Sequence, residues 1–221
     1  MTKNDADFDL VPAHLAVQAM RDNGYRNAAY AAAELIDNAV QAGATAVELL
    51  VREQVELVQE RKRARVQEIA VLDNGSGMTA ELLRQALQFG NGSHLNDRSG
   101  IGRFGMGLPS ASVSQCRRVD VWTWRQGVDS ALHSYIDLDE VIAGVQRDVP
   151  APEPEGIPEF WRSVGSEFGK SGTLVVWSKL DRLLWRTGKA IMDNSEFLVA
   201  RMYRQFLVTG QVKIRLATHT N

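Results

Sequence analysis

Cysteine is nearly absent from this chain, because Cys116 is the only one among 221 residues. A single cysteine excludes an internal disulfide and any metal site built on several cysteines. We expect Cys116 to be a small buried hydrophobe. Histidine is also scarce, and its spacing does not suggest metal ligation, so we expect surface or loop positions for His14, His94, His133 and His219.

Long apolar runs and an excess of positive charge are missing as well. No stretch approaches about 18 apolar residues, and the N-terminal ten residues lack an apolar signal core. The net charge of −2 gives no global basic field for nucleic acid. One local basic patch (Arg61, Lys62, Arg63 and Arg65) is explained at least as well by a charged hairpin tip. We therefore expect a cytoplasmic protein without a membrane partner.

The composition is that of an ordinary globular chain, with 44% hydrophobic and 24% charged residues. Four of the six prolines fall between residues 150 and 158. This predicts that segment 146–170 is a rigid surface loop or an insertion outside the core. Because a buried strand is predicted directly afterwards, at 172–177, we expect one domain over 1–221 with an ordered core over 10–220.

Helical and strand periodicities alternate along the chain. Strands 47–57 and 66–72 are expected to form an antiparallel hairpin joined by a charged turn, QERKRA. Thr79 is a predicted N-cap, with Leu82 on the inner face of its helix. The expected helices are 12–21, 27–42, 80–89, 139–145, 190–207 and one beginning near 108, and the other strands are 118–125, 130–138, 172–177 and 211–217. This pattern predicts an α+β layer sandwich.

The helix over residues 27–42, NAAYAAAELIDNAVQA, carries the first chemical signal. Glu34 and Asn38 are four residues apart, so their side chains leave the same face one turn apart. Glu34 can accept a proton from water, and Asn38 offers an oxygen ligand to a hard cation. The alternative is a solvated polar pair on an exposed edge.

The second signal is Asp73-Asn-Gly75-Ser-Gly77-Met78, which follows a predicted strand. Spaced glycines let the backbone approach a flat ligand closely. The Asp73 carboxylate can accept a hydrogen bond from an exocyclic amine such as that of adenine. The alternative is a tight turn, since Asp-Asn-Gly is a common turn sequence.

The third signal is the glycine-rich segment GIGRFGMG at residues 100–107. Glycines before a helix expose backbone N–H groups and the positive end of a helix dipole, which suits an anion. The segment is not a dinucleotide fingerprint, because residues 91–99 are polar rather than a hydrophobic strand, and no Gly-Lys-Ser/Thr of a Walker A loop follows. A glycine-rich lid remains, or a loop without a ligand.

Together with Gly172-Thr173 at the start of a strand, these blocks resemble the motifs of the GHKL ATPase superfamily. That superfamily includes gyrase B subunits, heat-shock chaperones, histidine kinases and MutL, and the resemblance is nearest to its MutL-like and MORC-like branch. It implies the Bergerat fold, a two-layer α/β sandwich in which helices cover one face of a mixed sheet.

The resemblance also implies roles for individual residues. Glu34 is similar to the general base that activates water, and Asn38 to the ligand of Mg²⁺. Asp73 is similar to the acid that binds adenine, with Gly77 beneath the ring and Thr173 assisting. The remaining implied nucleotide-binding residues are Gly75, Met78, Gly102, Arg103, Phe104, Gly105, Met106 and Gly107.

The activity implied is Mg²⁺-dependent ATP binding and slow hydrolysis, with lid closure and homodimerisation driving a larger machine on a protein or DNA client. Two alternatives remain, a histidine-kinase-type phosphotransferase and a non-hydrolysing, nucleotide-sensing dimerisation module. Glu34 argues against the kinase, because phosphotransfer to a histidine needs no base for water. No phosphoacceptor helix precedes the first block either.

This sequence departs from its relatives in two respects. Gln41 stands where several relatives carry an acid. Relatives of the gyrase and MutL type continue into a transducer domain that supplies a lysine to the γ-phosphate, whereas this sequence ends at Asn221. That difference leaves open whether the sequence is a piece of a longer protein.

Overall fold

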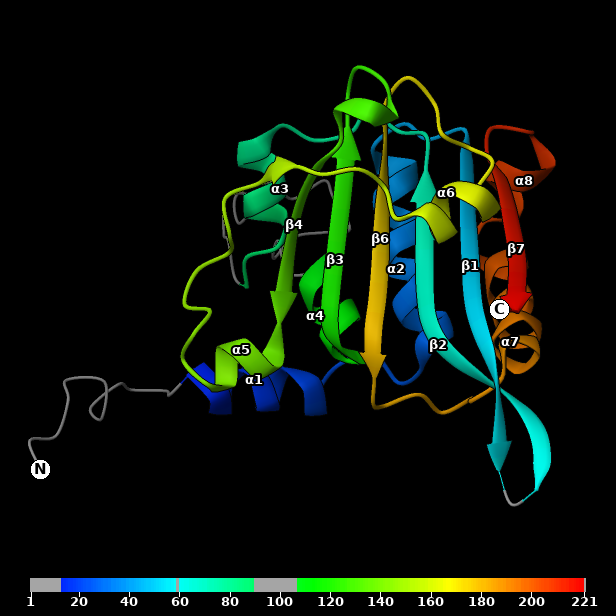
Figure 1. Cartoon of the computed structure of the whole chain (residues 1–221). Helices are drawn as coiled ribbons and strands as arrows, with labels where there is room; N and C mark the ends of the chain where they lie inside the picture. The colour runs from blue at the N-terminus through cyan, green and yellow to red at the C-terminus, as the bar shows by residue number, and fades with distance from the viewer. Residues whose placement is uncertain (1–12, 59, 90–106, 221) are drawn as a thin grey trace, which may run out of the picture.

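The computed structural model describes residues 13–58, 60–89 and 107–220. Seven strands form one sheet in the order β5-β4-β3-β6-β2-β1-β7 (Figure 1). The parallel pair is β1 with β7, and the other neighbouring pairs are antiparallel. The sheet is therefore mixed, as predicted. The strands are β1 (Ala46–Val58), β2 (Arg61–Asp73), β3 (Cys116–Trp124), β4 (Leu132–Asp137), β5 (Glu153–Pro154), β6 (Gly172–Leu180) and β7 (Lys213–Thr220).

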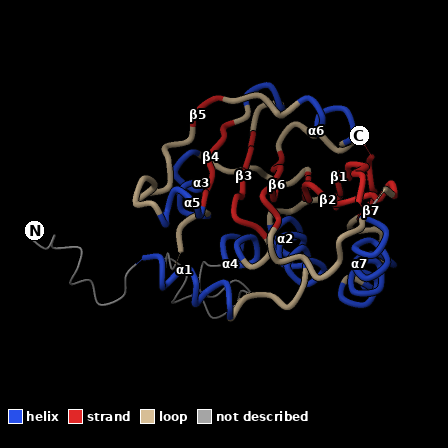
Figure 2. Tube along the Cα trace, turned by 60° about the horizontal axis from the view of Figure 1, so that its bottom comes forward, coloured by secondary structure: helices blue, strands red, loops and turns tan. Residues whose placement is uncertain are grey.

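Helices α1, α2, α4 and α7 cover one face of the sheet, whereas α6 lies on the other face (Figure 2). The α+β sandwich predicted from the sequence is thus confirmed. The helices are α1 (Ala13–Asp22), α2 (Ala28–Gln41), α3 (Ala80–Ala86), α4 (Gly107–Val113), α5 (Leu138–Ile142), α6 (Glu159–Val164), α7 (Gly188–Met202) and α8 (Arg204–Val208), with a 3₁₀ turn, η3, at Val128–Ser130.

Helix α2 is the central element of the helical layer. Asn27 caps its first turn, because the Asn27 side chain accepts hydrogen bonds from the backbone N–H groups of Ala29 and Tyr30. Small side chains let a helix approach its neighbours closely, and the buried side chains of α2 are Ala28, Ala29, Ala31, Ala32, Ala33, Leu35, Ile36 and Ala39. The helix packs against both α4 and α7.

Two hydrophobic cores lie on opposite faces of the sheet. The larger one fills the space between the sheet and the helices and includes Ile36, Val71 and Trp177. The smaller one lies on the other face and includes Trp122, Trp124, Trp161, Leu72 and Leu174. Cys116 is fully buried in the larger core, as expected.

The proline-rich segment contributes to the second core, so the expectation that it lies outside the core is wrong. Trp161 on α6 is only 2% exposed and packs in the smaller core. Upstream of it, β5 adds an edge strand to the sheet by pairing with Leu132 and His133 of β4. The layer formed by α1, α2, α4 and α7 leaves this sheet face uncovered, and the proline-rich segment, with α6, packs on its apolar part.

The charged turn expected at QERKRA is also wrong. Strand β2 already begins at Arg61, and β1 continues to Val58, so the hairpin tip is only two residues long. Residues 61–64 of the expected turn pair with β1. Four of residues 61–65 are charged and they occupy both faces of the strand, so the alternation of apolar and polar residues that indicates a strand is absent there.

Helix α3 follows its predicted cap, because the Thr79 hydroxyl accepts a hydrogen bond from Leu82 N at 3.2 Å. The helix ends at Ala86, three residues earlier than expected. Leu83 and Leu87 are buried, but Leu82 is 46% exposed rather than on the inner face.

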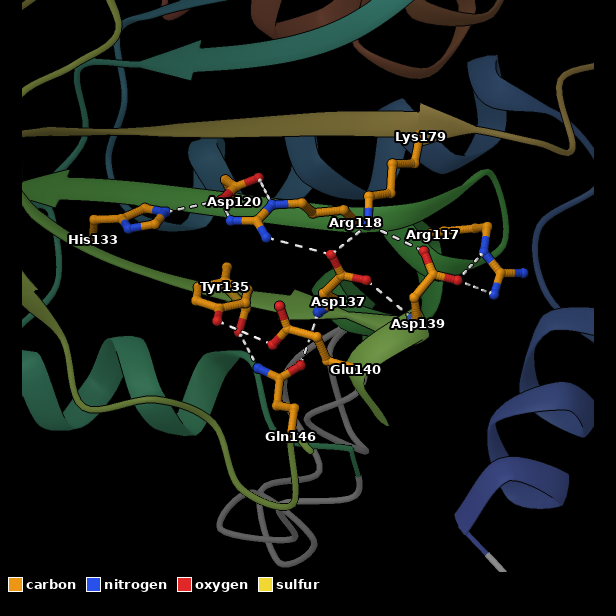
Figure 3. Close-up of polar contacts among 10 residues, drawn as sticks. All are labelled: Arg117, Arg118, Asp120, His133, Tyr135, Asp137, Asp139, Glu140, Gln146 and Lys179. Atoms are coloured by element: carbon orange, nitrogen blue, oxygen red, sulfur yellow. Dashed lines mark hydrogen bonds and ion pairs between the residues drawn. The ribbon is translucent and has the colours of Figure 1, made fainter. Parts of the chain in front are cut away.

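His133 lies within strand β4 and not in a loop, which corrects the expectation for this residue. Its ring stacks on Trp122, and its nitrogens lie 3.0 Å from Asp120 Oδ1 and 2.9 Å from Glu155 Oε2. Figure 3 shows the ring pointing along the sheet toward Asp120. His219 likewise lies in a strand, β7.

His133 joins a network of charged side chains on the same sheet face (Figure 3). Arg118 contacts Asp120 through two nitrogens and also reaches Asp137, which Lys179 Nζ contacts at 2.7 Å. Burial alone would raise the pKa values of both carboxyls, but these cations and hydrogen bonds outweigh burial and hold both pKa values below their usual range.

Trp161 provides a test of the second core. Trp161→Ala should destabilise the protein by about 3–5 kcal/mol, because it removes a large, fully buried side chain and leaves a cavity. Glu159→Ala, at an exposed position of the same helix, is the control and should change stability by less than about 0.5 kcal/mol. Urea unfolding of the two variants checks this. If both substitutions changed the free energy of unfolding by the same small amount, segment 146–170 would not be part of a hydrophobic core.

Candidate functional site

A cavity of about 470 Å³ lies between the helical layer and the sheet, bounded by α2, α3, the start of α4, β2 and β6. Mostly apolar walls with a few polar groups are typical of small-molecule sites. The polar side chains along it are Glu34, Asn38, Gln41, Asp73, Ser76, Gln85 and Thr173. Its apolar walls include Leu35, Val71, Met78, Leu82, Leu108 and Val175.

Asp73 is the last residue of β2 and is only 7% exposed. Its Oδ1 accepts a hydrogen bond from Gly75 N at 2.8 Å. Burial raises the pKa of the Asp73 carboxyl to about 6, although the backbone N–H groups of Gly75 and Thr173 act in the opposite direction. At neutral pH the cavity therefore contains a desolvated carboxylate, which is a strong acceptor for an N–H donor.

Thr173 lies opposite Asp73 in the β2–β6 register and lines the cavity. Its hydroxyl is 3.3 Å from that of Thr123 on β3, which accepts a hydrogen bond from Met78 N at 2.8 Å. Thr123 therefore joins Thr173 to the turn after Asp73. The sequence analysis missed Thr123, because its role depends on a strand pairing that spans about 50 residues.

The two glycines of the second block have different structural roles. Gly77 lines the cavity with φ of +63°, and a Cβ there would overlap the carbonyl oxygen of Trp124. A side chain at this position would be both strained and blocked. Gly75 is not among the cavity-lining residues, and it acts through its N–H on Asp73.

Glu34 faces the start of helix α4. The Tyr25 hydroxyl donates a hydrogen bond to Glu34 Oε2 at 2.9 Å. On the other side, a Cβ at Gly107 would overlap Glu34 Oε1, so a side chain at position 107 would displace the Glu34 carboxylate from its present place. Burial, followed by the neighbouring Glu34, raises the pKa of Tyr25 far above its usual value, so Tyr25 remains a donor. The sequence analysis did not identify Tyr25.

Asn38 and Gln41 line the same cavity further along α2. Asn38 is one turn beyond Glu34, about 6 Å along the helix axis. In the described part of the chain, no three His, Cys, Asp or Glu side chains gather into a metal site. Mg²⁺ at a nucleotide site needs only one or two protein oxygens, with phosphates and waters completing its shell. The Asn38 amide oxygen is chemically suited to that task.

A second tyrosine contacts α2 from the opposite side. The hydroxyl of Tyr203, which follows α7, lies 2.6 Å from Asp37 Oδ1 and 2.8 Å from the Ala33 carbonyl oxygen. Burial raises the pKa of Asp37 despite this hydrogen bond. This contact connects the residue preceding Asn38 to the C-terminal helices.

The structure brings the first, second and fourth sequence blocks together around one cavity, because Glu34, Asn38, Asp73 and Thr173 all line it. Gly107, the last residue of the third block, lines it too. The other expected lid residues lie outside the described residues: Gly102, Arg103, Phe104, Gly105 and Met106.

A mixed sheet, one helical layer and a ligand-sized cavity between them define the GHKL type of α+β fold. The chain belongs to the family of histidine kinase-, DNA gyrase B- and HSP90-like ATPases, whose model matches residues 25–165. ATP binding is the activity that this family supports in general.

Among solved structures, the chain is similar to one described as the crystal structure of the N-terminal domain of a DNA repair protein. The TM-score is 0.52 at 13% sequence identity, over 93% of this chain and 52% of that chain. This likeness shows a shared fold, and the chain spans about half the length of that relative. No curated protein matches the sequence.

The buried carboxyl generates a prediction about stability. The folded-state pKa of Asp73, about 6, exceeds the ordinary value of 3.8, so between these values the folded state holds a proton that the unfolded state releases. Its stabilising contribution is therefore present below about pH 4 and is lost as pH rises through 6. Asp73→Asn should stabilise the ligand-free protein by about 1–3 kcal/mol at pH 7.5, and the gain should shrink toward pH 4.

Denaturant unfolding of the wild type and Asp73→Asn at both pH values measures this difference. Asp148→Asn, at an exposed position outside the cavity, is the matched control and should show no such gain. A difference between Asp73→Asn and wild type that is independent of pH would contradict the raised pKa.

Proposed function

We propose that this protein binds Mg·ATP in the cavity and hydrolyses the ATP slowly. The observation that carries the proposal is that one cavity is lined both by a buried acceptor, Asp73, and by the Glu34–Asn38 pair. An adenine amine would donate to the Asp73 carboxylate, and Thr173 would assist it. Gly77 and Met78 would lie against the ring.

The direction of α2 supports this placement of the nucleotide. Ser76 N donates to the Ala42 carbonyl oxygen at 3.0 Å, so the turn after Asp73 lies at the C-terminal end of α2. Glu34 is eight residues earlier, about 12 Å along the helix axis. An extended nucleoside triphosphate with its base at Asp73 would therefore direct its phosphates toward Asn38 and Glu34.

Each residue of the pair would have a separate task. Asn38 would hold Mg²⁺, which neutralises phosphate charge when bound. Glu34, oriented by Tyr25, would accept the proton of the attacking water. Gly107 and the preceding residues 102–106 would cover the phosphates.

Slow turnover follows from the charge of the cavity. None of the described residues that line it is a lysine or an arginine. The negative charge that develops in the transition state would therefore lack a cationic partner from these residues. The same observation favours a second candidate function, a nucleotide-sensing module that dimerises without hydrolysis.

We further propose a cytoplasmic protein in which lid closure and dimerisation drive a larger machine that acts on a protein or DNA client. The sequence blocks favour the MutL-like and MORC-like branch for this role. A solved relative about twice as long is compatible with additional parts in such a machine. In the described residues, no helix is both long and apolar enough to span a bilayer.

The metal assignment is tested with Asn38→Ala. Removing the oxygen ligand should weaken Mg·ATP binding on the order of 10- to 100-fold. In EDTA, where no metal is bound, the variant and the wild type should bind ATP equally. Titration calorimetry in both buffers measures this, and an unchanged Mg·ATP affinity would remove Asn38 from the metal site.

The base assignment is tested with Glu34→Ala and Tyr25→Phe. A general base contributes about 10²–10⁴-fold in rate without holding the ground state. Glu34→Ala should therefore nearly stop hydrolysis while ATP affinity stays within a few fold. Tyr25→Phe removes only the orienting hydrogen bond and should reduce turnover by a smaller factor.

Turnover and nucleotide affinity are measured side by side over a range of protein concentrations, because dimerisation would make the wild-type rate rise with concentration. Loss of affinity and turnover together in Glu34→Ala would make the residue structural. A wild type without turnover at any concentration would favour the nucleotide sensor.

A further inference from the structure

The hairpin of β1 and β2 extends beyond the rest of the sheet (Figure 1). Strand β7 pairs with β1 only as far as Glu53, and β6 pairs with β2 only from Ile69 onward. Within the described residues, segments 54–58 and 61–65 therefore pair only with each other. We call this two-stranded projection the distal ribbon.

One face of the distal ribbon carries a row of arginines. Arg61, Arg63 and Arg65 alternate along β2, so their side chains leave the same face at intervals of about 6.6 Å. Arg61 and Arg63 are exposed, and Arg65 is half-buried. Opposite Arg63 in the register is Glu56, whose carboxylate accepts a hydrogen bond from Gln67.

These arginines are not neutralised by the described part of the chain. No salt bridge joins Arg61, Lys62, Arg63 or Arg65 to a described carboxylate. The other face of the distal ribbon presents Lys62 beside Leu57, which is 73% exposed. Both faces are thus open to a partner.

The charge of the distal ribbon is opposite to that of the remaining chain. Residues 54–65 contain four cationic side chains and two carboxylates, Glu56 and Glu60, which gives +2. Since the whole chain has a net charge of −2, the remaining residues carry −4. A polyanion would be attracted to the distal ribbon and repelled by the rest of the molecule.

We propose that the distal ribbon docks on duplex DNA and contacts its phosphate backbone without reading sequence. The major groove, about 12 Å wide, admits a two-stranded β-ribbon. Guanidinium groups bind phosphate oxygens bidentately. A straight row of arginines fits the regularly spaced phosphates of a DNA strand better than it fits the irregularly spaced carboxylates of an acidic protein loop. This inference deepens the proposed function by naming the client, but its evidence is independent of the nucleotide cavity.

The two sites are far apart. Arg61 precedes Asp73 by twelve residues on the extended strand β2, which corresponds to about 40 Å. Substitutions in the distal ribbon should therefore leave nucleotide binding unchanged. Failure of DNA docking and failure of ATP binding can thus be distinguished in the same variant.

The test measures binding of the full chain to fluorescent duplex DNA of several unrelated sequences by anisotropy, at a series of salt concentrations. The triple variant Arg61→Thr, Arg63→Thr, Arg65→Thr keeps strand propensity and removes the three cations. Its affinity should fall on the order of 100-fold at about 0.1 M salt, and its salt slope should decrease by about 3.

Two further triple variants separate ribbon position from total charge. Arg201→Ala, Arg204→Ala, Lys213→Thr removes three exposed cations elsewhere and should retain most of the affinity. The variant Arg61→Lys, Arg63→Lys, Arg65→Lys keeps the charge but loses the bidentate contacts, so its affinity should lie between those of the wild type and the threonine variant. If the threonine variant does not fold, as judged by thermal unfolding and nucleotide binding, Arg63→Glu alone should reduce affinity more than about tenfold.

Several results would overturn the proposal. One is a wild type that does not bind duplex DNA. Another is an equal loss of affinity in the ribbon variant and the control variant. A third is competition by polyglutamate as strong as that by DNA, which would indicate general attraction of acidic polymers.

Discussion

The close packing of α2 against the sheet is the constraint on which the rest of the structure depends. Six of the eight buried side chains of this helix are alanines, so little separates its backbone from its neighbours. Because the helix is held in this way, its polar face meets the ends of β2 and β6 across one cavity. Bulkier side chains at these positions would move Glu34 away from Gly107, where the present fit allows no Cβ.

Much of the fold was predictable because local patterns are strong. The alanine-rich helix α2 and the strands β1, β3 and β4 were expected close to their observed bounds, whereas β2 begins five residues earlier than expected, at Arg61. The four sequence blocks of the site were also recognised, although only the fold shows that Glu34 and Asp73 line the same cavity. The segment 146–170 and His133 were misjudged because the burial of Trp161 and His133 results from contacts with distant segments, which local composition does not encode.

Tyr25 and Thr123 were missed for a related reason. The Tyr25 hydroxyl donates a hydrogen bond to Glu34, and the Thr123 hydroxyl accepts one from Met78 N and lies beside Thr173, but neither residue belongs to a recognisable sequence pattern. The buried carboxyls also differ according to their tertiary partners. Asp120 has Arg118 and His133 beside it and a lowered pKa, whereas Asp73 is neighboured chiefly by backbone N–H groups and has a raised one. An acceptor without a cationic partner is left available to a ligand.

The hydrogen bond between Tyr203 and Asp37 has a mechanical consequence. Asp37 immediately precedes Asn38 on a rigid helix, and Tyr203 lies at the junction of α7 and α8. A displacement of this junction must either break a partly buried hydrogen bond or shift α2 with it. Movement at the α7–α8 junction is therefore coupled to the helix that carries Asn38 into the cavity, and movement of that helix is coupled to the junction.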